Sequence, residues 1–455
     1  MNDRGVEPLI DENVAGLRNA GKAMATVQIS SPRIPEVGVI GLVPDRWHWQ
    51  WQPRHQVMTR LAQYFPVVWM NPAENWRHSL NFRKLLARRT ETPVAETAFV
   101  VHTPSPLLPE FYSLSWLAKL TLAKRLQDSR RLLLKMGCKK VVLYLWRPEF
   151  APALDCVPYD LSCYHIDDEY SFSTVETPTP QLEASLIARV DQVFIHSPAL
   201  LEKKGKINPN TSHTPNGVDF DAYMRPVPEP ADLAGIPHPR IGYSGHVKKQ
   251  LDWPLLMELS ATHPEWCFVF VGAATAHPEM APHLEELSRR TNVRFLGGKT
   301  ARELAAYPQH FDVCLMPYQQ DDYTKYIYPL KLHEYLASGR PIVGTPIASL
   351  EPFRSVVWLP ENTQQWSAAI SEALRPAANS AQVCAARQSV AQKHDWQILV
   401  RQIAEILAGH LGPPYADLFA KYFPPGAGAE SPAEAAPSSG ALTPVFSRRK
   451  LPGIG

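Results

Sequence analysis

The sequence lacks the features that would place it in or across a membrane. No apolar run approaches the 18 or more residues that a spanning helix requires. The opening residues, MNDRGVEPLI, do not show the basic-then-apolar order of a secretory signal peptide. We therefore expect a cytoplasmic protein.

Cysteine is scarce, and no excess of charge of either sign is present. The six cysteines form no C-x-x-C pair and lie mostly in apolar stretches, which is typical of small buried side chains in a reducing compartment and unlike zinc ligands or a disulfide framework. With 46 basic and 44 acidic residues the net charge is only +2. Affinity for a nucleic-acid backbone needs a large basic surface, so we expect no nucleic-acid partner.

What is present indicates an ordinary globular protein of about two domains. Hydrophobic residues make up 45% and charged residues 20% of the 455 positions, and that length exceeds what one hydrophobic core usually supports. Residues 1–34 carry no sustained period, and residues 425–455 are rich in Pro, Ala, Gly and Ser. We expect both end segments to be disordered.

Between the ends, short β-branched runs alternate with helical periods, an order that predicts parallel sheets covered by helices. In the first half, strands are expected at 37–42, 66–70, 97–102, 140–145, 160–165 and 191–195, with helices near 54–63, 114–136, 181–189 and 198–204. In the second half, strands are expected at 240–243, 267–271, 293–296, 311–315, 341–344 and 355–358, with helices near 252–262, 280–290, 300–307, 330–338 and 364–374. The fold class is therefore α/β, with two Rossmann-like doubly wound domains, 35–218 and 219–410, facing across a cleft. The helices over 380–409 are amphipathic and could cross back to the first domain.

The most informative stretch is YIYPLKLHEYLASGRPIVGTP at 326–346. Pro329 stands where a helix takes its first residue and Gly339 where it takes a left-handed C-terminal cap. The exposed N-terminus of such a helix suits a phosphate, and Lys331 and Glu334 share a face of its first turn. They could serve a diphosphate and a ribose diol, or form an ordinary solvated pair.

This stretch resembles the donor-site motif of retaining glycosyltransferases of the GT-B fold, group 1 type. In that motif two Glu residues bracket a turn and a helix, and a Gly, a basic residue, Pro and a β-branched strand follow. The matching positions are Pro329, Leu330, Glu334, Ala337, Gly339, Pro341, Ile342 and Val343. The stretches PNGVD at 215–219 and RIGYSGHVKKQLDWPLL at 240–256 resemble the junction between the domains and the first strand and turn of the second domain. The likeness covers about residues 36–410.

The resemblance implies a donor site for a nucleoside diphosphate sugar, used as a co-substrate without any metal or other cofactor. Glu334 would bind the ribose. Lys331 and the helix N-terminus at Leu330 would bind the diphosphate, and Gly245 would let the backbone approach the diphosphate from the other side. The first Glu of the motif falls on Tyr326. The basic residue expected soon after Gly245 falls on His246, so either Lys248 or Lys249 substitutes for it or no residue does. The expected donor-binding residues are Gly245, His246, Lys248, Tyr326, Leu330, Lys331 and Glu334.

In this fold the first domain binds the acceptor, and two polar clusters follow its strands. In RWHWQWQPRHQ at 46–56, Arg54, His55 and Gln56 open a helix, although the tryptophans could equally be a cover for the core. In HIDDEYSFS at 165–173, two adjacent acids point to opposite sides of an extended chain, so only one faces the cleft. We expect Arg54, His55 and Gln56 to bind the acceptor, and His165, Asp168 and Lys331 to be catalytic.

These inferences predict transfer of a sugar, with retention, from a nucleoside diphosphate sugar to a saccharide or lipid-linked acceptor in polysaccharide or glycoconjugate biosynthesis. The alternative is a non-catalytic GT-B protein that binds nucleotide or glycan as a scaffold, because of the change at Tyr326. Residues 76–89 and 116–135 are basic and amphipathic. This pattern is typical of helices that contact the surface of the inner leaflet, and also of core helices whose outer face is basic.

Overall fold

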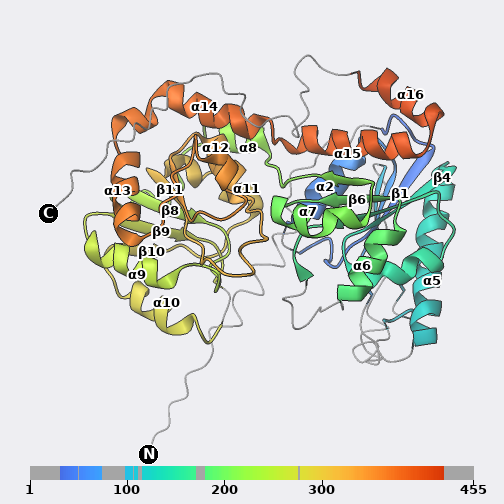
Figure 1. The fold of residues 1–455 in the computed structure, drawn as a ribbon, viewed down its shortest axis with the longest axis horizontal. Helices are drawn as coiled ribbons and strands as arrows, with labels where there is room; N and C mark the ends of the chain where they lie inside the picture. Colours follow the sequence, from blue (N-terminus) through green and yellow to red (C-terminus); the bar gives the residue numbers. More distant parts are fainter. Residues whose placement is uncertain are drawn as a thin grey trace, which may run out of the picture.

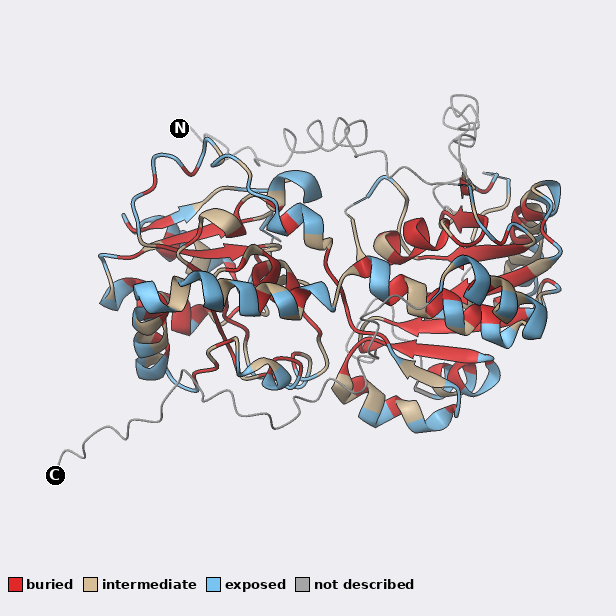
Figure 2. Cartoon of the chain, turned by 90° about the horizontal axis from the view of Figure 1, so that it is seen from above, coloured by how far each residue is buried: buried red, intermediate tan, exposed pale blue. Residues whose placement is uncertain are grey.

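The protein was analysed as a computed structural model that describes residues 31–49, 51–73, 98–105, 107–110, 115–170, 180–274 and 277–424. Two α/β units lie side by side, and in each a buried sheet is covered by helices that expose their outer faces (Figures 1 and 2). Residues 1–30 and 425–455, which were expected to be disordered, lie outside the described residues. Ile34 is 1% exposed and packs into the first core, so the prediction of disorder is wrong for that residue.

The first unit is built on a seven-stranded parallel sheet in the order β3-β2-β1-β4-β5-β6-β7. Its strands are β1 (Val37–Leu42), β2 (Val67–Met70), β3 (Phe99–His102), β4 (Lys140–Leu145), β5 (Leu161–Ile166), β6 (Gln192–Ile195) and β7 (Thr211–His213). Its helices are α2 (Pro53–Leu61), α5 (Ser115–Lys135), α6 (Pro180–Arg189) and α7 (Pro198–Lys204), with 3-10 turns at Pro148–Asp155 and Gly205–Ile207. Every residue of β1 is buried, because helices cover both faces of the sheet.

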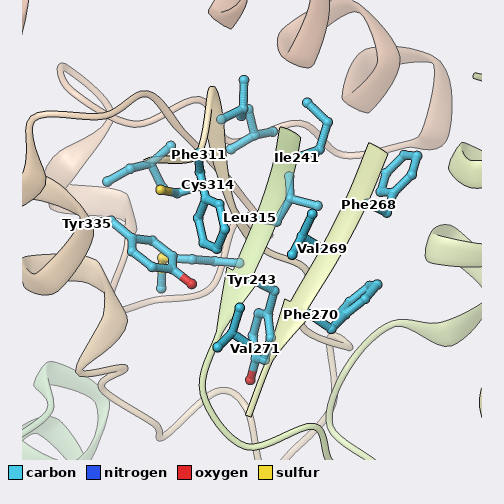
Figure 3. Packing of buried hydrophobic residues seen from close by; sticks show 14 of the residues in the cluster. Ile241, Tyr243, Phe268, Val269, Phe270, Val271, Phe311, Cys314, Leu315 and Tyr335 are labelled. Atoms are coloured by element: carbon cyan, nitrogen blue, oxygen red, sulfur yellow. The ribbon is translucent and has the colours of Figure 1, made fainter. Parts of the chain in front are cut away.

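The second unit holds a five-stranded parallel sheet in the order β10-β9-β8-β11-β12. Its strands are β8 (Arg240–Ser244), β9 (Cys267–Val271), β10 (Val293–Phe295), β11 (Val313–Met316) and β12 (Ile342–Gly344). Its helices are α8 (Phe220–Met224), α9 (Trp253–Thr262), α10 (Ala281–Ser288), α11 (Ala301–Leu304), α12 (Lys331–Ser338), α13 (Thr363–Ala373) and α14 (Ala381–Gln392). Short 3-10 turns span Pro308–His310, Glu351–Phe353 and Pro376–Asn379. Figure 3 shows aromatic and aliphatic side chains filling the space between β8, β9, β11 and α12.

The two helices that follow α14 connect the second unit to the first. Helix α15 (Trp396–His410) follows α14 and packs on α2, and α16 (Pro413–Tyr422) packs on α15 (Figure 1). The apolar face of α15, including Leu399, Ile403 and Leu407, is part of the core of the first unit. The end of the chain therefore ties the second unit to the first.

The structure corrects several expected elements. Residues 355–358 form no strand, because the turn after Phe353 leaves only an isolated bridge between Trp358 and Val343. The helix expected over 300–307 ends at Leu304, and its last residues form a turn. Strand β7 was not predicted, because its sequence, Thr-Ser-His, has no apolar residue.

The strand orders fix where ligands can bind. The order reverses between β1 and β4 in the first sheet and between β8 and β11 in the second. In open parallel sheets, ligands bind beyond the carboxyl ends of the strands at such reversals. The loops after β1, β4 and β5 and the loops after β8 and β11 should therefore form the site.

Candidate functional site: a cationic pocket facing a carboxylate

The loop after β8 brings the backbone close to α12. Gly245, the residue after β8, has φ of +132°, a conformation that residues with a side chain rarely adopt. A Cβ atom on Gly245 would lie 2.3 Å from Cε and 2.5 Å from Nζ of Lys331. Gly272 lies behind it, where a Cβ would meet the Gly245 carbonyl oxygen at 2.1 Å. Two glycines thus let the loop run directly beside the Lys331 ammonium group.

Lys331 is the first residue of α12, and aromatic side chains hold its ammonium group. Its Nζ lies 5.0 Å from the centre of the Tyr243 ring and donates a hydrogen bond to the Tyr318 hydroxyl. The helix begins at Lys331, one residue later than the expected Leu330, and no side chain caps it. Gly339 ends the helix with φ of +75°, the left-handed cap that the sequence predicted. The first turn of α12 therefore offers N–H groups and a cation together.

A second lysine joins the first from the loop after β8. Lys249 is exposed, whereas Lys248 is half-buried, and within the described residues the Lys248 side chain forms no hydrogen bond or ion pair. Burial, followed by the charge of Lys331, lowers the pKa of Lys248, and Asp168 partly opposes this. The same two lysines and burial lower the pKa of His246. Two cations and an imidazole thus converge on one place, and an anionic ligand would offset the repulsion between the two cations.

Glu334 lies one turn further along α12. Burial raises its pKa, and Lys331 and a hydrogen bond from the Tyr223 hydroxyl only partly oppose this. A carboxylate kept partly dehydrated beside a lysine can accept hydrogen bonds from a diol. Lys331 and Glu334 are therefore not the solvated surface pair that was the plain alternative.

The first unit contributes Asp168, which lies beyond the end of β5 and interacts electrostatically with Lys248. Asp168 accepts a hydrogen bond from the Glu169 backbone N–H at 2.8 Å and one from the Tyr323 hydroxyl of the second unit at 3.4 Å. Burial, and then the charge of Asp167, raise the pKa of Asp168 to about 6. The backbone of Glu169, Arg147 and Lys248 oppose this rise. A carboxyl group that titrates near neutrality is suited to a hydrogen-bonding or proton-transfer role.

Asp167 points the other way, as the alternation of an extended chain requires. Its Oδ2 accepts a hydrogen bond from Arg54 Nη1 at 2.5 Å, and its Oδ1 accepts one from the Tyr170 hydroxyl at 2.5 Å. The Nε of Arg54 donates to Asp45. Burial alone would raise the pKa of Asp167, but Arg54 and Arg147 more than offset it and lower that pKa to about 2.

A cavity of about 610 Å³ opens between the units beside Asp168. From the first unit, Arg147 and the Asp168–Tyr170 segment line it; from the second, the residues are Lys249, Gln250, Trp253, Pro254, Glu279, Met280, His283, Gln319, Asp321 and Tyr323. Its size is typical of small-molecule sites. No group of three His, Cys, Asp or Glu residues suited to a metal ion occurs in the part of the chain that the structure describes.

Three of the sequence predictions for the first unit need correction. His55 is fully buried, its ring packed against Trp51 and Trp69, and burial lowers its pKa to about 3. His165 is 4% exposed and stacks on Trp146, and its Nδ1 forms a 2.8 Å hydrogen bond with Tyr144. His55 as an acceptor contact and His165 as a catalytic group are therefore wrong: both are core histidines.

Arg54 is also wrong as an acceptor contact. It is 6% exposed, and its guanidinium group is occupied by Asp45 and Asp167. Gln56 is half-buried, and its amide oxygen accepts a hydrogen bond from Arg60, so its acceptor role stays a prediction.

The two remaining donor-site predictions lie where the units meet. The ring of Tyr326 lies 4.7 Å from Nζ of Lys203, a residue of α7 in the first unit. The side chain of Leu330 packs against the core of the first unit, which leaves its backbone to the helix start. A direct donor contact by either residue stays a prediction.

Sequence reasoning missed the tyrosines and Arg147. Tyr223 and Tyr318 hold Glu334 and Lys331, and Tyr323 reaches Asp168 from the opposite wall. Tyr223 lies in α8, and Tyr318 and Tyr323 lie in the loop between β11 and α12. Each is an ordinary aromatic residue within its local sequence. No spacing in the sequence could have indicated them.

Comparison with known proteins gives a consistent result. Residues 238–375 match the family model described as glycosyl transferases group 1. A Bacillus subtilis protein named as the teichuronic acid biosynthesis glycosyltransferase TuaH is 29% identical over 231 residues. That match covers 49% of this chain and 57% of the relative, so the chain spans just over half the length of that protein.

Solved structures show the fold. A UDP-forming α,α-trehalose-phosphate synthase from Burkholderia xenovorans superimposes with a TM-score of 0.55 at 13% identity, over 83% of this chain and 100% of the other. An E. coli trehalose-6-phosphate structure bound with UDP-2-fluoro glucose gives 0.57 at 12% identity, over 81% and 98%. At this identity the likeness concerns the two-domain architecture.

Proposed function

We propose that this chain is a group 1 glycosyltransferase of the GT-B fold and that it transfers a sugar from a nucleoside diphosphate sugar to a hydroxyl of a saccharide or lipid-linked acceptor. The teichuronic acid relative supports a role in polysaccharide biosynthesis. The observation that carries the proposal is the convergence of Lys248 and Lys331 beside Gly245 and the uncapped start of α12. Two neighbouring ammonium groups repel each other and suit a diphosphate, the group that every nucleotide sugar presents.

The other groups fit the parts of the donor and the acceptor. Glu334 would accept hydrogen bonds from the ribose hydroxyls, and the cavity beside Asp168 would hold the acceptor. Asp168 would then accept a hydrogen bond from the attacking hydroxyl and orient it. This assignment replaces Arg54 and His55 by Asp168, Arg147 and Tyr323 as the residues around the acceptor.

The chemistry follows from these positions. The bond between the anomeric carbon and the diphosphate oxygen breaks, and negative charge grows on that oxygen. Lys331 and Lys248 stabilise the charge in a partly dehydrated site, where such groups act strongly. The acceptor oxygen bonds to the same carbon on the face that the diphosphate leaves, which gives retention, and its proton passes to the departing diphosphate. The two lysines supply the positive charge, so we propose that no metal ion is required.

The test separates transition-state stabilisation from ground-state binding. We expect Lys331→Ala to lower kcat by roughly 10²-fold, the scale for losing one preorganised charged group. Because the ribose does not change during transfer, Glu334→Ala should chiefly raise the donor KM. The measurement is release of nucleoside diphosphate from a panel of nucleotide sugars at saturating acceptor.

Neighbouring lysines provide a matched control. With nucleoside diphosphate alone, Lys248→Ala should weaken binding strongly, and the exposed Lys249→Ala should leave the affinity unchanged. Equal effects of both variants would remove the assignment of the diphosphate site. If the wild type binds nucleotide through Glu334 but turns over no nucleotide sugar, the non-catalytic scaffold function replaces transfer, and Tyr326 becomes the residue to examine.

A lipid-linked acceptor would bring the chain to a membrane surface. No helix within the described residues is long and apolar enough to span a bilayer. Helix α5 exposes Trp116 (62%) and Leu120 (59%) one turn apart, with basic side chains between and beyond them. Such a face suits the interface of an anionic membrane. The other basic segment, 76–89, lies outside the described residues.

A further inference from the structure

Arg54, Asp45, Asp167 and Tyr170 form a buried polar network that the proposed reaction does not use directly. Asp167 has 7% of its side chain exposed, and the side chain of Arg54 is equally buried. Arg54 comes from α2, Asp45 from the loop after β1, and Asp167 from the loop after β5. Buried ion pairs carry a large desolvation cost, so an array of this kind seldom adds much stability. Its place directly behind Asp168 points to another role.

Geometry ties the network to the cavity. Asp167 is held at both oxygens, by Arg54 at 2.5 Å and by Tyr170 at 2.5 Å. Tyr170 is itself fixed, since its hydroxyl also bonds to the carbonyl of Trp146 at 3.1 Å, and the guanidinium group of Arg147 lies 4.5 Å from its ring centre. With Asp167 anchored on the inner side, the next residue must face the opposite side of the chain. That side is the cavity, where Asp168 meets Tyr323.

We propose that Asp167 is a positioning residue for Asp168: held from behind by Arg54 and Tyr170, it turns the Asp168 carboxyl into the cavity. The inference rests on the proposed function in one respect, that Asp168 orients the acceptor hydroxyl. The placement and the ionisation of Asp168 do not depend on that function.

Groups from several parts of the chain influence the pKa of Asp168. Asp167 and the backbone of Glu169 act from its own segment, Arg147 from the loop after β4, Lys248 from the loop after β8, and Tyr323 from the loop after β11. After burial, Asp167 is the largest influence, and it raises the pKa of Asp168. Asp45 pairs with the same arginine but is not among the largest influences on the pKa of Asp168. Asp167→Asn and Asp45→Asn therefore form a matched pair of variants that remove the same charge from the same cation.

The first readout needs no activity. Because the folded protein holds the Asp168 proton more tightly than the unfolded chain does, ionisation of Asp168 costs stability. This cost is absent below the ordinary pKa of 3.8, grows as the pH rises, and is complete above about 6. The Asp168→Asn variant has no carboxyl group to ionise and does not carry this cost. Its Tm should therefore rise relative to that of the wild type as the pH increases over that range.

In the Asp167→Asn background we expect the upper end of this range to fall by on the order of one pH unit, as removal of a neighbouring like charge predicts. In the Asp45→Asn background it should stay near pH 6. An unchanged range in Asp167→Asn, or an equal shift in both backgrounds, overturns the proposal. If Asp167→Asn does not fold, Tyr170→Phe keeps all charges and removes the hydroxyl that bonds to Asp167 and to the Trp146 carbonyl.

The second readout is sugar transfer. Asp167→Asn should move the acidic limb of kcat/KM to lower pH, and Tyr170→Phe should raise the acceptor KM without moving that limb. Asp45→Asn should not move the limb. If the Tm range shifts as expected but wild type transfers no sugar, the proposed function fails and the positioning role stands. If wild type transfers sugar and neither variant alters the limb or the acceptor KM, the positioning role fails and the function stands.

Discussion

Replacing Gly245 by alanine should disable the proposed donor site through a single methyl group. The added Cβ would lie 2.3 Å from Cε and 2.5 Å from Nζ of Lys331, so the ammonium group must move away from the loop. Loss of one hydrogen bond to a charged group costs about 1.5–3 kcal/mol. The affinity for a nucleoside diphosphate should therefore fall roughly 10- to 100-fold. Isothermal titration calorimetry of the apo protein measures this directly.

The same substitution also strains the backbone, and a control must separate the two effects. At φ of +132° an alanine costs about 1–3 kcal/mol, which lowers Tm by several degrees. Gly137, between α5 and β4, has φ of +91°, and a Cβ there would meet no atom within 4 Å. Gly137→Ala should therefore lower Tm by a similar amount but leave the nucleotide affinity intact.

A double mutant tests whether the methyl group acts through Lys331. If it does, Gly245→Ala should weaken binding very little further in a Lys331→Ala background, because the cation is already gone. Full additivity of the two losses would show that the loop and the lysine act separately. Wild-type affinity in Gly245→Ala would refute the reasoning altogether, since the ammonium group could then leave its place without consequence.

Two further predictions concern the donor carboxylate and the surface of α5. Burial raises the pKa of Glu334 above the ordinary 4.5, so its ionisation costs stability that is absent below pH 4.5 and grows above it. Glu334→Gln should therefore melt at a higher temperature than wild type at pH 8, with the gap closing as the pH falls towards 4.5, while nucleotide affinity drops; a constant gap across this range would contradict the assignment. For α5, changing Trp116 and Leu120 together to serine should reduce partition onto anionic vesicles at low salt more than tenfold, because each side chain contributes about 1.5–3 kcal/mol when buried, without changing nucleotide affinity. If wild-type protein does not co-sediment with such vesicles, the proposal of contact with a membrane surface is wrong.

Much of the fold could be predicted because its signals are local. Strands such as β1 and β9 are continuous apolar runs, since helices cover both faces of each sheet. The donor helix could be bounded within one residue because Pro329 and Gly339 punctuate it chemically. Residues 211–213 and 355–358 were assigned wrongly because a polar edge strand and an apolar turn reverse the usual local pattern.

The sequence predicted the part of the candidate site on α12, and Asp168 from the first unit, but not the residues around them. Lys331 and Glu334 lie three residues apart on one helix, so their proximity follows from helical geometry. The choice between Lys248 and Lys249 depended on which of them the loop after β8 turns inwards. No local sequence pattern indicates that direction. His55 and His165 were polar residues near strand ends, but aromatic partners from other strands enclose them.

The sequence by itself determined two α/β units, the donor helix with its lysine and glutamate, and the family that they resemble, because these depend on backbone periods and on spacings of a few residues. Tertiary structure alone decided that Asp168 faces Tyr323 across the cavity, that Asp167 is anchored behind it, and that α15 packs on the first unit. Those contacts join residues 113 to 155 positions apart or bring the last helices back to the first core. They form only when whole sheets have folded and packed, and no local preference of the chain encodes them.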